Sequence, residues 1–289
     1  MLPTFIIAGA AKSGTTALHE VLNSHPEICM SWMKGPTYFT EEASRSTHRR
    51  GQEWYERLFS ECVNAQAIGE VSPFYMTSKD APELIYGTIP KVKLLFVLRN
   101  PIDRLYSYYR YSLQRGFRLP SLEQMIAENH PEYTQAVFVS SYQLHLKRYL
   151  DVFPREQIIV FIYEDWVENP QTFLSAMFET IGVDASFESP LLSKRYNPSQ
   201  RPRYVLFQNT LNSLGETLIK FDLPKPIFNL MKKIRQTLWQ LNSEKIEGGN
   251  VLSQKKRRDL QTTFAETVDY VEHYLRRTIP TWHQPKKKQ

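Results

Sequence analysis

Cysteine is scarce in this sequence, with only Cys29 and Cys62 among 289 residues. No CxxC or CxxH spacing occurs, so the sequence predicts no zinc site. A disulfide between the two cysteines stays open. A reduced cytoplasmic protein is the simpler interpretation, because disulfides are rare in that compartment.

Long apolar runs are also absent. No stretch of 18 apolar residues occurs, whereas a helix that spans a bilayer needs about 20. The apolar N-terminus lacks the basic region of a signal peptide, and residues 5–8 are better interpreted as a core strand. We therefore expect no membrane partner.

Positive charge exceeds negative charge by only six, with 36 Lys and Arg against 30 Asp and Glu. Such an excess suits an anionic small molecule, nucleic acid or a membrane surface. The basic clusters at 255–258 and 286–288 are expected to be solvated, the second in a disordered tail at 284–289. A basic scaffold or nucleic-acid-binding protein stays possible on composition, but no motif supports a nucleic-acid partner.

Strand and helix patterns alternate over the first 182 residues. Buried strands are predicted at 5–9, 67–71, 93–99 and 157–163, with a shorter one at 26–31 and helices between them. This order predicts an α/β fold with a doubly wound parallel sheet covered by helices on both faces. The last hundred residues show no obvious strand, and their clearest helix is 253–277. We expect a single domain over 1–289, with an α/β core at 1–182 and a mostly helical part at 183–289.

A phosphate-binding pattern follows the first strand, in "FIIAGAAKSGTTALHEVL" (5–22). A loop that opens a helix turns backbone N–H groups toward an anion, and Gly9 and Gly14 allow close approach. The common nucleoside-triphosphate loop is GxxxxGK[ST]. Here Thr15 stands where that loop has lysine, and the lysine is Lys12. The spacing therefore disfavours a P-loop kinase or nucleotide hydrolase.

A second pattern, "LLFVLRNPIDRLYSYY" (94–109), places Arg99 at the end of a strand and Ser107 eight residues later in a helix. Arginine suits phosphate because its guanidinium bonds two oxygens at once. The alternative is structural, with Arg99 paired to Asp103 and Ser107 on a helix surface.

Together the two patterns resemble the motifs of the sulfotransferases that use 3′-phosphoadenosine 5′-phosphosulfate (PAPS). Within that family they are most similar to the motifs of the bacterial and the carbohydrate or heparan-type enzymes. The resemblance implies a P-loop-like fold, PAPS as donor, 3′-phosphoadenosine 5′-phosphate (PAP) as product, and no metal. It implies that Lys12 reaches the oxygen bridging phosphate and sulfate, and that Arg99 and Ser107 bind the 3′-phosphate. The other implied donor-binding residues are Ser13, Gly14, Thr15, Thr16 and Arg195, the last from "RYNPSQRPRY" (195–204). "YEDWVENP" (163–170) is similar to a strand-to-helix junction of the family.

A hydroxyl acceptor needs a general base. Glu70 in "IGEVSPFY" resembles a glutamate that acts as base in some carbohydrate sulfotransferases, although it could instead hold Lys12 or a substrate group. The family often has a second glutamate, in the pattern Lys-Glu-Pro-x-x-Phe. This chain has "KGPTYF" there, with Gly35 at the position of the glutamate. Lys34 and His48 are further candidates for the acceptor side, whereas His19 and His25 are expected to be structural.

The sequence therefore predicts transfer of a sulfuryl group to a hydroxyl or amine of a small-molecule natural product or carbohydrate. Two alternatives stay open: a P-loop kinase or hydrolase, and a non-catalytic basic binding protein. ATP with Mg²⁺ would bind the first, and nucleic acid would bind the second with a steep salt dependence.

Overall fold

The computed structural model describes residues 1–41, 46–192, 200–220, 225–245 and 253–283. Arg195 and the tail 284–289 lie outside these ranges. The chain forms two compact units, and each is built from separate stretches of sequence. The first unit contains Met1–Pro101, Ser141–Tyr196 and Phe264–Gln284, and the second contains Ile102–Ser140, Asn197–Thr263 and Pro285–Gln289. The single domain stays a prediction.

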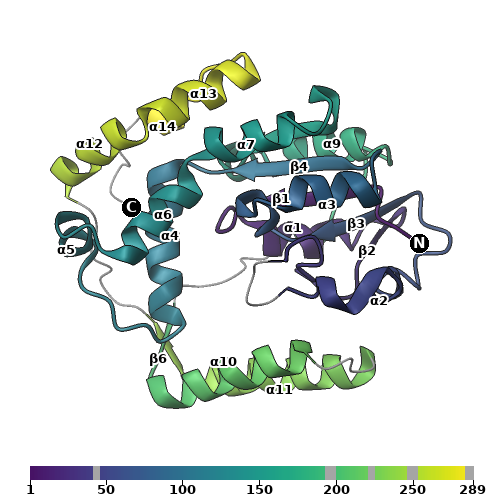
Figure 1. Ribbon diagram of the computed structural model, residues 1–289, viewed down its shortest axis with the longest axis horizontal. Helices are drawn as coiled ribbons and strands as arrows, with labels where there is room; N and C mark the ends of the chain where they lie inside the picture. Colours follow the sequence, from purple (N-terminus) through teal and green to yellow (C-terminus); the bar gives the residue numbers. More distant parts are fainter. Residues whose placement is uncertain (42–45, 193–199, 221–224, 246–252, 284–289) are drawn as a thin grey trace. The chain divides into compact units, whose positions relative to one another are not determined.

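A five-stranded sheet forms the centre of the first unit (Figure 1). Its strands are β1 (Phe5–Gly9), β2 (Ile28–Met30), β3 (Ala67–Val71), β4 (Lys93–Leu98) and β5 (Ile158–Ile162). The order is β2-β3-β1-β4-β5, and every neighbouring pair is parallel. The predicted doubly wound sheet is confirmed. The chain moves to one side of β1 for β2 and β3 and to the other side for β4 and β5, so the carboxyl end of β1 is the switch point where ligands bind in such sheets.

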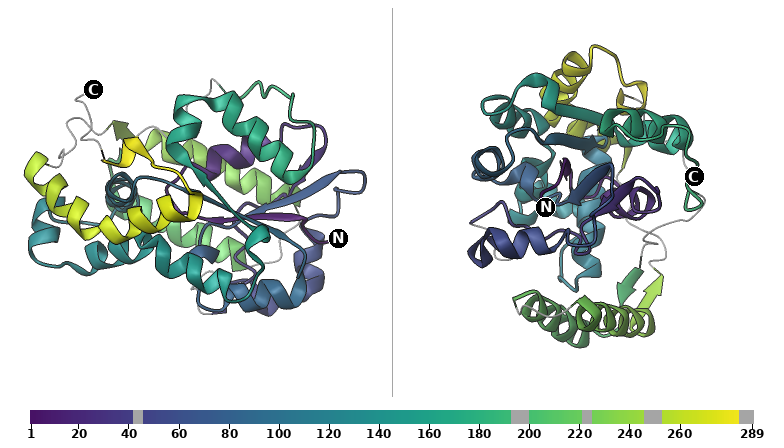
Figure 2. Two further views of the ribbon diagram at one scale, coloured as in Figure 1. Left: turned by 90° about the horizontal axis from the view of Figure 1, so that it is seen from above. Right: turned by 90° about the vertical axis from the view of Figure 1, so that its right-hand side faces the viewer.

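Helices lie on both sides of the sheet, as the two views of Figure 2 show. Alternate residues of a strand point to opposite faces, and Phe5 and Ile7 of β1 pack with one helical layer while Phe96 of β4 faces the other. The first layer contains α1 (Thr15–Leu22) and α9 (Pro170–Ile181). In the second layer, the Phe96 ring lies 4.9 Å from that of Tyr149 in α7 (Tyr142–Leu150). The remaining helices of this unit are α2 (Gly51–Arg57), α3 (Ala81–Thr88), α8 (Tyr163–Glu168), α13 (Ala265–Leu275) and α14 (Pro280–His283).

The second unit is mostly helical. It contains α4 (Pro101–Gln114, whose first residue belongs to the first unit), α5 (Leu122–Ala127), α6 (Pro131–Ser140), α10 (Val205–Lys220), α11 (Lys225–Leu241) and α12 (Gln254–Thr263). Ser121 caps α5, because its hydroxyl accepts the N–H of Gln124.

The expectation that the C-terminal hundred residues have no strand was wrong. β6 (Gln200–Pro202) and β7 (Ser243–Lys245) form an antiparallel pair in the second unit. Beside this pair, the Asn242 side chain joins the two segments, since its Oδ1 accepts from the Tyr204 N–H at 3.0 Å and its Nδ2 donates to the Tyr204 carbonyl at 3.1 Å. Strands of three residues are too short for a hydrophobic alternation that the sequence could reveal.

The single helix expected over 253–277 is two helices, α12 and α13, separated at Phe264. Two β-branched residues, Thr262 and Thr263, precede the break, and such residues are stiff and crowd a helix. The Thr263 hydroxyl also donates to the Asp259 carbonyl one turn back, a bond that bends helices. Phe264 is itself buried, so packing holds the interruption in place.

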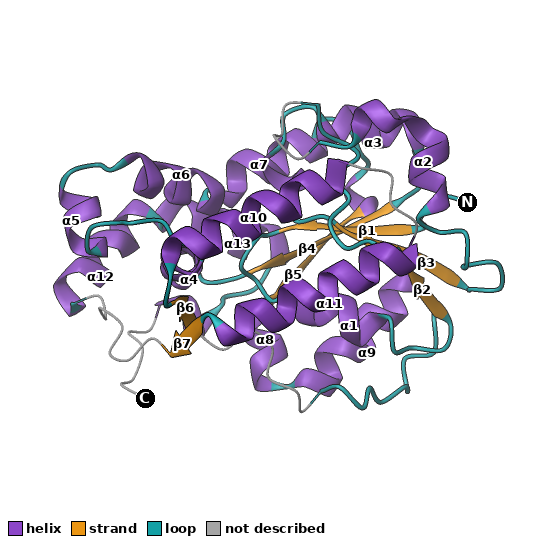
Figure 3. Ribbon diagram, turned by 90° about the horizontal axis from the view of Figure 1, so that it is seen from below, coloured by secondary structure: helices purple, strands orange, loops and turns teal. Residues whose placement is uncertain are grey.

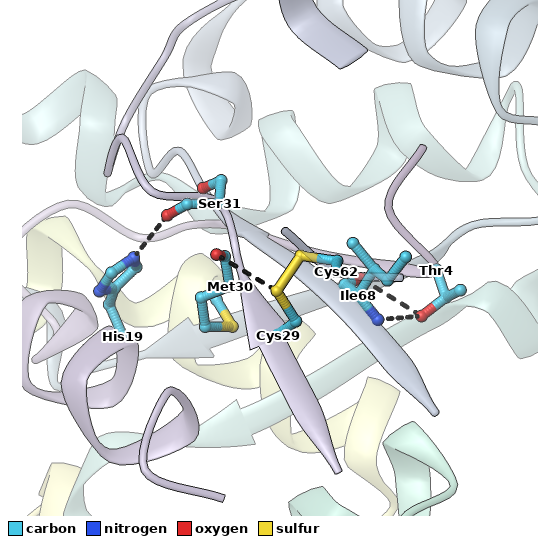
Figure 4. Close-up of a disulfide and its surroundings, with 7 residues drawn as sticks. All are labelled: Thr4, His19, Cys29, Met30, Ser31, Cys62 and Ile68. Carbon is cyan, nitrogen blue, oxygen red and sulfur yellow. Dashed lines mark hydrogen bonds between the residues drawn. A yellow bond between two sulfur atoms is a disulfide. The ribbon is translucent and has the colours of Figure 1, made fainter. Parts of the chain in front are cut away.

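The cysteines form a disulfide between Cys29 of β2 and Cys62, which follows α2 (Figure 4). Their Cα atoms lie 5.4 Å apart although 33 residues separate them in sequence. The expectation of reduced thiols was wrong, because the return of the chain from α2 to β3 brings Cys62 beside β2. Disulfides persist mainly in oxidising compartments, so the cysteines give no support to a cytoplasmic location, which stays a prediction. Among the described helices, none combines the length and apolar character needed to cross a bilayer.

Candidate active site

The loop between β1 and α1 forms a tight turn at the switch point of the sheet. The Ala10 N–H donates to the Val97 carbonyl of β4 at 2.9 Å, and Lys12 and Gly14 have φ values of 75° and 80°. Gly14 precedes α1 and has no side chain to cap the helix, and no acidic residue lies in the first turn. The positive end of the helix dipole therefore faces the loop, as an anion site requires.

The side chains of this loop have the buried polar groups expected of a binding site. Ser13 is fully buried, and its Oγ has no hydrogen-bond partner among the described residues. Thr15 is buried and Thr16 is half-buried at the start of α1. An unsatisfied buried hydroxyl costs free energy, so Ser13 is suited to a ligand that supplies the missing contact.

Gly14 is required at its position for two reasons. A φ of 80° is disfavoured for residues with a side chain. A β-carbon there would also lie 2.7 Å from Cζ3 of Trp166 and 2.9 Å from Cε2 of Tyr163. The aromatic rings of Tyr163 and Trp166 in α8 therefore pack directly against the loop.

Arg99, which follows β4, connects the second predicted phosphate motif to the first. Its Nη1 donates to the carbonyl of Lys12 at 3.2 Å, and its guanidinium carbon lies 4.8 Å from the centre of the Tyr163 ring. Arg99 Nε is buried without a hydrogen-bond partner among the described residues. Asp103 pairs with Arg257 at 3.1 Å within the second unit, and the alternative pairing of Arg99 with Asp103 stays a prediction.

Glu164 of α8 is a site residue that the sequence analysis did not identify. Its Oε1 accepts the Asn100 N–H at 3.1 Å, and its Oε2 accepts the Trp282 indole N–H at 2.8 Å. Burial raises the pKa of Glu164, while the hydrogen bonds from Trp282 and Asn100 and the charge of Arg99 lower it. The junction "YEDWVENP" gave a signal, but only the fold shows that its glutamate holds the residue next to Arg99.

Glu70 lies on β3 opposite Ile6 of β1 and is fully buried. The Tyr55 hydroxyl donates to its Oε2, and its Oε1 has no hydrogen-bond partner in the described part of the chain. Burial raises the pKa of Glu70, and the nearby hydroxyls of Ser72, Tyr55 and Tyr75 oppose this effect. The neutral acid is thus stabilised relative to an exposed glutamate.

Aromatic residues surround Glu70 and fix the segment after Gly35. The Tyr38 and Tyr55 rings stack with centres 4.5 Å apart. The Tyr75 hydroxyl oxygen accepts the N–H groups of Tyr38 and Phe39 at 2.9 and 3.2 Å. The Gly35 N–H donates to the Val71 carbonyl at 2.9 Å, so Gly35 lies at the carboxyl end of β3. The sequence analysis missed Tyr55 because its contact with Glu70 joins a helix to a strand.

The other predicted residues have more ordinary settings. Lys34 is half-buried, and the Nδ1 and Nε2 of His48 lie 3.0 Å from the Tyr38 carbonyl and 3.7 Å from Glu41 Oε1. His19 and His25 lie within hydrogen-bond distance of backbone carbonyls, those of Ser31 and Asp184, as structural residues do. Ser107 is half-buried on α4 in the second unit. The described residues contain no group of His, Cys, Asp and Glu suited to a metal ion.

The fold and this loop define a class of nucleotide-dependent group-transfer proteins, and comparison with known proteins identifies the family. Residues 2–201 match the model of the sulfotransferase domain. The chain therefore belongs to the sulfotransferase domain family.

Several curated relatives share this region. The human bifunctional heparan sulfate N-deacetylase/N-sulfotransferase 2 is 28% identical over 203 residues, which are 63% of this chain and 22% of the relative. The mouse heparan sulfate glucosamine 3-O-sulfotransferase 6 is 31% identical over 186 residues, 63% of this chain and 52% of the relative. The Dictyostelium discoideum membrane-associated sulfotransferase kil1 is 36% identical over 116 residues, 39% of this chain and 24% of the relative. The chain thus spans about half or less of each of these proteins.

Solved structures show the same fold. A sulfotransferase from Alicyclobacillus acidocaldarius superimposes with a TM-score of 0.71 at 23% identity, covering 98% of this chain and all of the other. The mouse sulfotransferase SULT7A1, solved in complex with PAP, has a TM-score of 0.50 at 14% identity and covers 92% of this chain and 84% of its own. At these identities the likeness concerns the fold alone.

Proposed function

We propose that this chain transfers a sulfuryl group from PAPS to a hydroxyl or amine of a carbohydrate or another small molecule. One observation carries the proposal: the Arg99 guanidinium is hydrogen-bonded to the Lys12 carbonyl, at the uncapped start of α1. Two motifs proposed to bind anions, 87 residues apart in sequence, are thus in contact, which supports one shared donor site.

The residues present fit this donor. The loop N–H groups and the hydroxyls of Ser13, Thr15 and Thr16 would hold its 5′-phosphosulfate, with Gly14 permitting close approach. Arg99, with an unsatisfied Nε, and Ser107 would hold its 3′-phosphate. Arg195 is proposed to contact the nucleotide from the segment outside the described residues. When bound, the donor supplies a sulfuryl group with a phosphate leaving group.

Lys12 is proposed to neutralise negative charge that develops on the bridging oxygen during in-line displacement. The turn holds Lys12 at a positive φ, and the Arg99 bond fixes its carbonyl. A cation whose backbone is already fixed stabilises charge without reorganisation at the moment of reaction. This role differs from that of the lysine in a nucleoside-triphosphate loop and is consistent with Thr15 occupying that lysine's place.

Glu70 is proposed to be the general base, with positioning of Lys12 or of an acceptor group as the competing role. The raised pKa makes the Glu70 carboxylate a stronger base than an exposed one, which supports the role of base. Complete burial and the Tyr55 bond support a positioning role. Gly35 supplies no carboxylate, whereas Glu70 on β3 is a fully buried one. Lys34 and His48 are proposed to contact the acceptor.

A carbohydrate is the preferred acceptor class. The proposal rests on the two relatives whose names specify heparan sulfate, one an N-sulfotransferase and one a glucosamine 3-O-sulfotransferase. Because those proteins extend well beyond the matched region, the acceptor of this chain has to be measured.

The first experiment is thermal unfolding in the presence of PAP, ADP, ATP with Mg²⁺, or adenosine 5′-phosphate. Ligand at a hundred times its dissociation constant adds about 2.7 kcal/mol to the free energy of unfolding. We expect stabilisation by PAP and little by the other nucleotides. Stabilisation by ATP with Mg²⁺ alone would support a P-loop kinase or hydrolase. Stabilisation by none of them, with tight salt-sensitive binding to nucleic acid, would support a non-catalytic basic protein.

A further inference from the structure

The two residues that follow β4 are held by side chains from three helices of the first unit. The Tyr142 hydroxyl of α7 donates to the Arg99 carbonyl at 2.8 Å and accepts the Arg99 N–H at 3.4 Å. The Glu164 carboxylate of α8 accepts the Asn100 N–H at 3.1 Å, and the Asn100 side-chain amide donates to the Trp282 carbonyl of α14 at 3.3 Å. Asn100, Tyr142 and Trp282 are buried. The backbone that carries Arg99 is therefore fixed by partners outside the sheet.

The place of Glu164 in this arrangement follows from the sheet. Strands β4 and β5 are neighbours, and the last residues of the two strands pair with each other (Figure 3). Because α8 begins directly after β5, its first turn lies beside the residues that follow β4. Tyr163 contacts the Arg99 guanidinium, and the next residue, Glu164, contacts the backbone of Asn100.

A carboxylate is an unexpected group beside a site proposed to bind phosphate, since like charges repel. Burial raises the pKa of Glu164, and the charge of Arg99 is near enough to oppose that effect. The hydrogen bonds give a reason for the carboxylate. Its Oε1 accepts the Asn100 N–H, and its Oε2 accepts the Trp282 indole N–H at 2.8 Å. An ionised carboxylate has acceptors only, whereas a glutamine would place its own N–H groups against one of these donors.

We propose that Glu164 and Trp282 are positioning residues of the donor site, which hold Arg99 where its guanidinium meets the 3′-phosphate of the donor. This inference rests on the proposed function and adds α14 to the elements that serve the site. Glu164, Asn100 and Trp282 form a closed set of three hydrogen bonds. An arginine whose backbone is fixed before the ligand arrives loses less conformational freedom on binding.

Replacing Glu164 with glutamine tests the proposal by the sign of its effect. Glu164→Gln should weaken PAP binding about tenfold, the lower end of the range for loss of a charged hydrogen bond. Loss of a negative charge alone would instead strengthen the binding of an anion. Adenosine 5′-phosphate has no 3′-phosphate to meet Arg99, so its affinity should change little. Calorimetric titration of the full chain at pH 8 measures both affinities.

Replacing Trp282 with phenylalanine is the second variant, because it keeps an aromatic ring and removes only the indole N–H. Trp282→Phe should also weaken PAP binding and leave binding of adenosine 5′-phosphate nearly unchanged. An equal loss for the two nucleotides in both variants would mean that the three hydrogen bonds support the fold in general, and would overturn the proposal.

Asp165 provides the matched control on the same helix. It forms an exposed ion pair with Arg277, which also joins α8 to the segment that leads to α14. Asp165→Asn removes the same charge one residue away, and PAP affinity should stay close to that of the original protein. A loss equal to that of Glu164→Gln would mean that attachment of this segment, and not the bonds of Glu164, supports the site, and would reject the proposal.

The Arg99→Ala variant shows whether Glu164 acts through Arg99. In that background Glu164→Gln should cause no further loss of PAP affinity, because the side chain to be positioned is absent. The same loss in both backgrounds would overturn the proposal. If the original protein binds no PAP, the donor assignment itself fails. If the original protein binds PAP and Glu164→Gln binds it equally well or more tightly, only the positioning role fails.

Discussion

The side chain of Arg99, at the end of β4, donates to the backbone carbonyl of Lys12 in the loop after β1, at 3.2 Å. Tyr163 lies against both elements, 4.8 Å from the Arg99 guanidinium carbon and 2.9 Å from the position of a β-carbon on Gly14. The two ends of the proposed donor site are therefore in direct contact with each other and with the Tyr163 ring. A change in either motif is expected to affect the other, and the predictions below are designed to separate these effects.

Replacing Lys12 with alanine should reduce turnover by about a hundredfold or more, because the charge on the leaving oxygen loses its stabilising cation. Sulfate transfer from PAPS to an acceptor such as desulfated heparan sulfate gives the rate. Thermal stabilisation by PAP gives the binding in parallel. Turnover close to that of the original protein would remove Lys12 from the mechanism.

Replacing Arg99 with alanine should weaken PAP binding about 10- to 150-fold, the range for loss of a charged hydrogen bond worth about 1.5–3 kcal/mol. Adenosine 5′-phosphate, which lacks the 3′-phosphate, serves as the matched ligand, and its affinity should fall little. Calorimetric titration measures both affinities. An equal loss for the two ligands would show that Arg99 acts through the Lys12 carbonyl and not on the 3′-phosphate.

Glu70 should make stability depend on pH with a definite sign. Burial raises its pKa in the folded protein, so the folded state keeps the proton after the unfolded chain has released it at an ordinary pKa of about 4.3. Its contribution to stability is therefore greatest below that pH and decreases as pH rises toward the folded pKa. Glu70→Gln should remove this decrease, which denaturant unfolding at several pH values measures.

The same substitution tests the role of Glu70 in transfer. If Glu70 is the base, Glu70→Gln retains stabilisation by PAP and loses transfer. Tyr55→Phe provides a comparison, since removal of its hydrogen bond should raise the Glu70 pKa further and shift the acid limb of the pH–rate profile upward. Full transfer activity in Glu70→Gln would assign proton removal to another group.

Loss of the disulfide should destabilise the first unit. In the chain-entropy estimate, a crosslink that closes a loop of this length contributes about 3–4 kcal/mol. The melting temperature should therefore fall on reduction, and to the same extent in Cys29→Ser with Cys62→Ser. The double variant should be insensitive to reductant. An unchanged melting temperature would show that β2 and the segment after α2 are held together without the bond.

Gly14→Ala should destabilise the protein and impair PAP binding. A left-handed backbone costs a residue with a side chain about 1–2 kcal/mol, and the added carbon would meet Trp166 and Tyr163. Gly87→Ala in α3 is the matched control, because nothing lies within 4 Å of its added β-carbon and alanine favours a helix by about 0.5–1 kcal/mol. In thermal unfolding, the melting temperature should fall for Gly14→Ala and rise for Gly87→Ala. An unchanged melting temperature and unchanged PAP binding in Gly14→Ala would show that the loop accommodates the added side chain.

Much of this protein was determined by local sequence. The apolar runs at 5–9, 93–99 and 157–163 predicted three strands of the sheet because parallel strands buried on both faces read as continuous apolar segments. The loop with Gly9, Gly14 and Lys12 predicted an anion site because the turn and the helix start are properties of a short contiguous stretch. Membership of the sulfotransferase domain family was likewise visible in the two motifs.

Tertiary structure decided what depends on distant residues. The Cys29–Cys62 bond, the burial of Glu70 beneath Tyr55 and the link from Arg99 to Lys12 each join segments that no local pattern relates. The interruption at Phe264 and the pairing of β6 with β7 also depend on contacts between segments that are distant in sequence. Local sequence determines periodicity and turns, because these follow from neighbouring residues. Protonation, disulfide pairing and the meeting of two motifs follow from solvent exclusion and proximity, which exist only once the chain has folded.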